Sequence, residues 1–175
     1  MIIIPLPPAD IQTTLVAAQE RLAANIESGT SCPCCGQFAK LYARNLNKGM
    51  AGAMVGIFLM SRQKAGDWVH VNREIIGNSR LPDFVTNGAK SRDFSVLRFW
   101  GLIEERINVD KVTRTSGQWK LTEHGVGFVL GRSKVHKTVV VYNNQAIGFS
   151  GDMVDVSECL GSESFRYDEM MKDRK

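Results

Sequence analysis

The cysteines are the residues of this chain whose type and spacing best suit chemistry. Three of the four stand in the run Cys32-Pro33-Cys34-Cys35-Gly36. A Cys-x-x-Cys-Gly turn lets two thiolates converge while backbone amides point at the sulfurs, and Cys32 and Cys35 have the spacing of two ligands of a structural zinc. The sequence therefore predicts half of a zinc site.

The other half of such a site has no matching motif. A structural zinc needs four ligands, and the sequence contains no second Cys-x-x-Cys and no Cys-x-x-His. The remaining candidate ligands are scattered: Cys34, Cys159, His70, His124 and His136. Three interpretations stay open, namely a zinc completed by scattered ligands, a zinc shared across a dimer, and a reduced turn with Cys34 buried as a small apolar residue. Redox catalysis is not favoured, because the motif does not lie in a thioredoxin-like βαβ unit.

Catalytic motifs do not accompany the cysteines. The sequence has no nucleophile elbow, phosphate-binding glycine loop, paired-histidine metal motif or complete dinucleotide fingerprint. Gly125-Val126-Gly127 is only a fragment of such a fingerprint. We therefore expect a protein that is not an enzyme.

A second group of candidate residues lies in a short helix predicted after the Asn87-Gly88 loop, with Ser91 as its N-cap. On a helical wheel the apolar face holds Phe94, Leu97 and Gly101, and the polar face holds Ser91, Ser95 and Arg98 with Arg92 and Phe99 beside them. The polar face could be presented to solvent.

The elements before this helix are predicted from hydrophobic periodicity. A helix should begin just after the cysteine turn and extend to about Gln63. Its core stripe would be Tyr42, Leu46, Met50, Ala53 and Ile57, with Lys40, Arg44 and Lys48 on the opposite side. The charge-free stretch from Met50 to Met60 is 11 residues, too short for the roughly 20 that cross a bilayer, so it predicts a buried helix. A short strand over 68–71 and a short helix capped by Asn72 should follow.

The elements after the candidate helix alternate strand, loop and strand. Strands are expected over 102–107 and 118–121, with Lys111 and Arg114 in the loop between them. Thr122 should cap a helix that ends at Gly131. Residues 138–142 and 145–149 predict a β-hairpin, because Asn143 and Asn144 tolerate the positive φ of a two-residue turn. The segment from about 157 to 175 is acidic and should be helical near its end.

The N-terminal part predicts a separate helix. Asp10 is a plausible N-cap, Gly29 a stop, and Ile11, Leu15, Leu22 and Ile26 recur at helical spacing. This apolar face must pack on the main domain or on another copy of the chain. The N-terminus lacks the basic start and cleavage site of a secretory signal, so a cytoplasmic location is expected, with no membrane partner.

Composition and charge agree with an α/β protein of one main domain. The chain has 175 residues, 43% of them hydrophobic and 23% charged, and a formal net charge of +4. Residues 90–137 hold 10 Lys and Arg against 5 Asp and Glu, whereas residues 138–175 hold 4 against 7. This asymmetry is typical of a protein with one face toward an anionic polymer. We predict an N-terminal helix and cysteine knuckle over 1–36, a main domain over 37–131, and a hairpin with an acidic extension over 132–175.

The run Trp100-Gly101-Leu102-Ile103-Glu104, followed by Gly117-Gln118-Trp119-Lys120-Leu121-Thr122, resembles the MarR-like winged helix-turn-helix superfamily over roughly residues 68–131. With its Cys-Pro-Cys-Cys-Gly knuckle, the whole chain also resembles small phage-encoded proteins. The first resemblance implies a dimer that binds duplex DNA, with Ser91, Arg92, Ser95 and Arg98 toward the groove and Lys111, Arg114 and Lys120 on the backbone. It makes Arg98 the candidate for a bidentate guanine contact.

Two functions follow from the sequence as hypotheses. The first is a phage or prophage regulator that acts by occupying duplex DNA, in the host cytoplasm. The second is a protein-binding winged-helix module, such as a phage factor that inhibits a host enzyme or defence complex, with the hairpin over 138–149 and the acidic tail as its contact surfaces.

Overall fold

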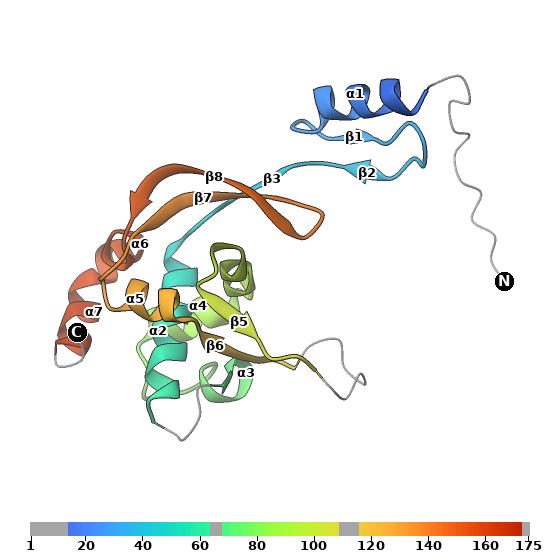
Figure 1. Ribbon diagram of the computed structural model, residues 1–175. Coiled ribbons are helices and arrows are strands. Elements are labelled where there is room, and N and C mark those ends of the chain that lie inside the picture. Colours follow the sequence, from blue (N-terminus) through green and yellow to red (C-terminus); the bar gives the residue numbers. More distant parts are fainter. Residues whose placement is uncertain (1–13, 64–67, 109–115, 173–175) are drawn as a thin grey trace.

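The chain folds as a mixed α/β protein, which confirms the predicted fold class at that level (Figure 1). The computed structural model describes residues 14–63, 68–108 and 116–172. The helices are α1 (Leu15–Asn25), α2 (Lys48–Ser61), α3 (Val71–Glu74), α4 (Asp83–Lys90), α5 (Glu123–Val129), α6 (Val156–Leu160), α7 (Ser164–Met171) and the 3₁₀ helices η1 (Asp93–Trp100) and η2 (Gly161–Glu163). The strands are β1 (Thr30–Ser31), β2 (Phe38–Ala39), β3 (Tyr42–Asn45), β4 (Val69–His70), β5 (Ile103–Glu105), β6 (Gln118–Leu121), β7 (Val135–Tyr142) and β8 (Gln145–Val154).

Helix α2 is the centre of the main body. All ten residues from Met50 to Leu59 are buried, because α4, α5, α6, η1 and β6 surround the helix. The Asn47 side chain caps it by accepting a hydrogen bond from the Met50 amide at 3.0 Å. The buried helix predicted from the charge-free stretch is confirmed.

The predicted start of this helix is wrong. Residues 42–45 form strand β3, which pairs antiparallel with β7 and places Tyr42 opposite Val141. The extended backbone continues to Asn47, whose cap starts the helix at Lys48. Tyr42 therefore lies exposed on a strand, and Arg44 is not on a helix face. Its strand partner is almost 100 residues away in the sequence, so local periodicity could not identify β3.

The loop predicted around Asn87-Gly88 is also wrong, because both residues lie inside helix α4. Gly88 fits there because α4 crosses α2 closely: a Cβ at this position would lie 2.2 Å from the Gly49 carbonyl oxygen. Tertiary packing thus overrides the local turn signal.

Strand β4, which precedes α3, joins β5 and β6, which follow η1, in a three-stranded antiparallel sheet with the order β4-β6-β5. Val69 pairs with Trp119, and Ile103 pairs with Leu121. Helix α5 begins after Thr122, which accepts a hydrogen bond from the Gly125 amide at 3.0 Å, and Gly131 follows its end with a φ of 69°. These strands, the cap and the stop were predicted from the sequence.

The predicted β-hairpin is confirmed and is longer than expected. β7 and β8 pair from Val135–Val154 to Tyr142–Gln145, and the turn residues Asn143 and Asn144 have φ angles of 45° and 61°. The hairpin joins β3 in a sheet with the order β3-β7-β8. The C-terminal α6 packs against α2 and α7 packs against α6, and Leu160, Tyr167 and Met171 are buried in the core. No helix within the described ranges is long and apolar enough to cross a membrane.

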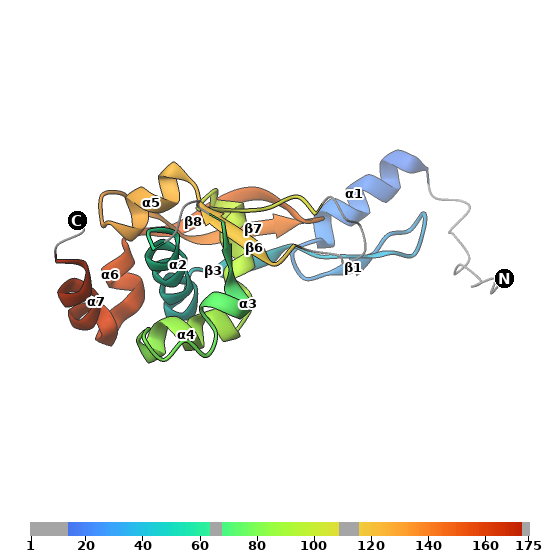
Figure 2. The same ribbon diagram turned by 90° about the horizontal axis from the view of Figure 1, so that it is seen from below.

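The N-terminal elements project from the body as an arm, which we define as residues 14–41. In both views α1 and the β1-β2 hairpin extend away from the other helices (Figures 1 and 2). The helix begins at Leu15 with Thr14 as its cap, so it starts later than predicted; the expected cap, Asp10, lies outside the described residues. Within α1 only Ala18 is buried.

Candidate nucleic-acid interface

The short helix predicted to begin at Ser91 is the 3₁₀ helix η1, and this changes which residues share a face. Residues three apart lie one above another in a 3₁₀ helix. Phe94, Leu97 and Trp100 are accordingly the buried line of η1. The α-helical wheel was wrong to place Gly101 on that face: Trp100 occupies the core position and Gly101 is exposed with a φ of 67°.

The outer line of η1 carries the predicted contact residues Ser95 and Arg98, with Arg92 directly before it. Arg92 is exposed and has a left-handed φ of 59°, which separates η1 from α4. The Ser95 hydroxyl donates to the Arg92 carbonyl at 3.2 Å, and the Ser91 hydroxyl donates to the Gly88 carbonyl at 2.9 Å. Both serine hydroxyls thus stabilise local backbone, whereas the two arginines extend into solvent.

Arg98 is exposed, and the β7-β8 turn orients it. Its Nη2 donates to the Asn144 side-chain oxygen at 2.6 Å, and its guanidinium carbon lies 4.9 Å from the centroid of the Phe99 ring. A guanidinium has five N–H donors, so this contact leaves several for a ligand. Asn144 therefore restricts the arginine to one orientation without consuming its capacity to bind an anion.

The three residues predicted to contact the DNA backbone divide into two groups. Lys111 and Arg114 lie outside the described residues. Lys120 lies on β6, where its Nζ is 2.6 Å from Glu104 Oε1 and 4.9 Å from the centroid of the Trp68 ring. Its charge is already paired, so Lys120 is poorly placed to neutralise a phosphate.

Arg44 is a candidate residue that the sequence analysis missed. It lies on β3 and lines one cavity together with Arg98. The full lining is Tyr42, Arg44, Val96, Arg98, Phe99, Val141 and Asn144. Neither arginine forms an ion pair with another residue that the structure describes. Only the pairing of β3 with β7 brings Arg44 near η1, and no local sequence signal could have indicated it.

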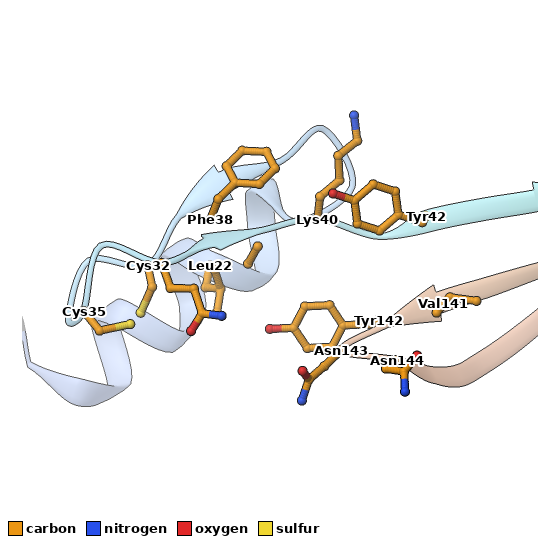
Figure 3. A pocket seen from close by; sticks show the side chains of 12 residues that line it. Leu22, Cys32, Cys35, Phe38, Lys40, Tyr42, Val141, Tyr142, Asn143 and Asn144 are labelled. Atoms are coloured by element: carbon orange, nitrogen blue, oxygen red, sulfur yellow. The ribbon is translucent and has the colours of Figure 1, made fainter. Parts of the chain in front are cut away.

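A second cavity adjoins the first and extends it along the arm (Figure 3). Tyr42, Val141 and Asn144 line both cavities. One wall carries Lys40 and Tyr42, and the other carries Tyr142, Asn143 and Asn144 from the hairpin turn. We call the two cavities together the basic trough, because its charged lining residues are Lys40, Arg44 and Arg98. Among the described residues that line it there is no Asp or Glu.

The predicted metal ligands Cys32 and Cys35 lie at the far end of the trough. The Gly36 amide donates to the Cys32 carbonyl at 2.8 Å, and Gly36 has a φ of 72°, which closes a tight turn. Backbone amides of Cys35 and Cys34 and the neighbouring thiols hold the pKa of Cys32 below its usual range. Desolvation raises the pKa of Cys34, which is exposed and does not line the trough. The interpretation of Cys34 as a buried apolar residue is therefore wrong.

Apart from Cys34, which lies in the turn itself, the scattered candidate ligands do not join this turn. Cys159 is buried on α6, where burial raises its pKa to about 11. His70 lies on β4, His124 on α5 and His136 on β7, all in the main body. Over the described ranges, no group of three or more His, Cys, Asp or Glu side chains could hold a metal ion. The described part of one chain thus brings together the two predicted ligands without a third that could share a metal ion with them.

No protein-family model, curated protein or solved structure matches the chain.

Proposed function

We propose that this protein binds duplex DNA without catalysing a reaction and acts by occupancy, as a phage or prophage regulator would. The element order supports a winged-helix core: α2, β4, α3, then α4 with η1, then β5 and β6. This is the sequence of helices and strands with which helix-turn-helix proteins present one helix to a DNA groove. The fold alone does not carry the proposal, because the same scaffold also serves in protein binding.

The observation that carries the proposal is the charge of the basic trough. Arg44 and Arg98 come from separate elements and line one cavity, and the described residues that line it include no carboxylate. Lys40 continues the positive lining toward the arm. Guanidinium groups bind phosphate oxygens through paired N–H donors, and Asn144 already holds Arg98 in place. A polyanion lying along the trough and the outer line of η1 would meet Lys40, Arg44, Arg92 and Arg98.

A salt titration on a mixed-sequence duplex tests this function. With at least three phosphate contacts per chain, the logarithm of the association constant should fall with the logarithm of salt concentration with a slope of roughly −3 or steeper. Fluorescence anisotropy on the full chain measures both the affinity and the slope. A protein with no measurable affinity for duplex DNA at low salt would refute the proposal.

The second candidate function is protein binding, and strand β8 favours it. β8 is ten residues long and forms an edge of the β3-β7-β8 sheet. Its outward side chains Ile147, Phe149 and Met153 are 54%, 48% and 48% exposed. A long edge strand with apolar side chains can accept a strand from another protein. A factor that inhibits a host enzyme or defence complex would use this edge.

A substitution that introduces a charge on strand β8 tests protein binding separately from DNA binding. If β8 binds a partner, Phe149→Glu should abolish capture of a stoichiometric partner from host lysate by the tagged full chain, because a carboxylate would be buried in the contact. Arg44→Ala should leave the captured band unchanged, since Arg44 lies on β3 at the other edge of the sheet. Partner capture that survives Phe149→Glu, or no captured band at all, would count against this candidate.

A further inference from the structure

The cysteine turn presents two converging thiols, and the described residues of its own chain supply no further ligand. Cys32 and Cys35 line the same cavity, and Figure 3 shows their sulfurs turned toward each other. A tetrahedral zinc needs four such ligands. The turn therefore has the geometry of half a site.

The remaining ligands cannot come from the main body. Cys159 is packed in the core around α6, and the His136 ring stacks on Phe149 with its Nδ1 3.1 Å from the Gly151 carbonyl oxygen. Elsewhere in the described chain, no further Cys, His, Asp or Glu lies near enough to Cys32 and Cys35 to form a metal-binding group. The described part of the chain therefore supplies only two of the four ligands.

The arm that carries the cysteines also carries exposed apolar side chains. Leu15 and Val16 at the start of α1 are 68% and 64% exposed, and Phe38 on β2 is 58% exposed. Figure 1 places the turn between β1 and β2 at the distal end of the arm, beside the start of α1. Half a metal site and an unpaired apolar surface thus occupy the same end of the molecule, and both would be completed by the same surface of another copy.

We propose that two copies of this chain share one zinc ion, with Cys32 and Cys35 of each copy as its four ligands. Four thiols each lose a proton as the four Zn–S bonds form, so the zinc and its ligands together carry a charge of −2. The apolar side chains of the two arms become buried as the zinc joins them. This inference does not rest on DNA binding.

Cobalt(II), which reports tetrahedral thiolate ligation by its absorption, and zinc are the probes for the full-length reduced protein. We expect saturation at one metal per two chains, and a monomer that becomes a dimer in sedimentation when metal is added and returns to monomer with chelator. Cys35→Ser should lose both metal uptake and the metal-dependent dimer. The matched variant Cys34→Ser, in the same exposed turn, should retain both. Circular dichroism of each variant verifies that the body is folded.

Four results would overturn the inference. They are saturation at one metal per chain on a monomer, no metal uptake by the reduced protein, a dimer that persists in chelator, and loss of metal by Cys34→Ser equal to that by Cys35→Ser. None of them affects the proposed DNA binding, which the salt titration measures separately on the same protein.

Discussion

Replacing Arg44 and Arg98 together with alanine should weaken binding to duplex DNA roughly a hundredfold at low salt. Each arginine contributes charge-assisted hydrogen bonds to phosphate, and a loss of about 1.4 kcal/mol per side chain corresponds to tenfold in affinity. The salt slope should become shallower by about two, because two phosphate contacts are lost. Anisotropy titrations at several salt concentrations measure both quantities.

Lys120→Ala is the matched control for this double variant. It also removes one positive charge from the predicted interface, but that charge is paired with Glu104 at 2.6 Å. The affinity of Lys120→Ala for duplex DNA should therefore stay within about twofold of the wild-type affinity, and its salt slope should be little changed. Equal losses from Lys120→Ala and from either trough arginine would show that net charge, and not the trough, drives binding.

The single arginine variants distinguish recognition of the DNA sequence from binding to the DNA phosphates. Arg98→Ala should also relax the preference between cognate and mixed-sequence duplex if Arg98 contacts guanine, as its place on the outer line of η1 allows. Arg44→Ala should weaken binding to every sequence alike, and the same holds for Lys111→Ala if the loop between β5 and β6 contacts the backbone. If Arg98→Ala keeps the wild-type preference for cognate over mixed-sequence duplex, then Arg98 contacts phosphate and not a base.

Gly125→Ala should destabilise the fold by about 3 kcal/mol or more. A Cβ at this position would lie 1.9 Å from the Leu102 carbonyl oxygen and 2.9 Å from its carbon, and both are backbone atoms that cannot move aside cheaply. The clash must separate α5 from the turn before β5. Urea unfolding monitored by circular dichroism measures the free energy of unfolding.

Gly127→Ala, in the same helix, isolates this clash. Its Cβ would lie 3.4 Å from the Ser133 hydroxyl oxygen, an ordinary contact. Because alanine is a better helix former than glycine by up to about 1 kcal/mol, this variant should be neutral or slightly more stable than the wild type. Similar unfolding curves for the two variants would contradict the close approach of α5 and Leu102.

The parts of the fold that were predictable are those with local causes. Asn143 and Asn144 tolerate the positive φ of the hairpin turn, Thr122 caps α5, and the absence of charge between Met50 and Met60 indicates a buried helix. Strand β3 and helix α4 were not predictable in this way. β3 depends on pairing with β7, and Asn87-Gly88 indicates a turn unless the close crossing of Gly88 over Gly49 is known.

The candidate site was predictable only in part. The polar face of η1 follows from the alternation of serine and arginine with apolar residues, although the period is three and not 3.6. Cys32 and Cys35 follow from their spacing. Arg44, Tyr42 and Asn144 were missed as site residues because they meet Arg98 only after β3, β7 and η1 have packed together. Because three separate segments of the chain form this cavity, no motif within any one of them could have predicted it.

The three-residue repeat of η1 limits how this segment can change in length. One residue corresponds to a third of a turn in a 3₁₀ helix. Deleting a single position between Phe94 and Arg98 would rotate the following residues by that amount, so Arg98 would exchange its solvent-facing place for the line that Leu97 and Trp100 occupy in the core. Substitution on the outer line leaves the packing intact, whereas insertion or deletion does so only in steps of three.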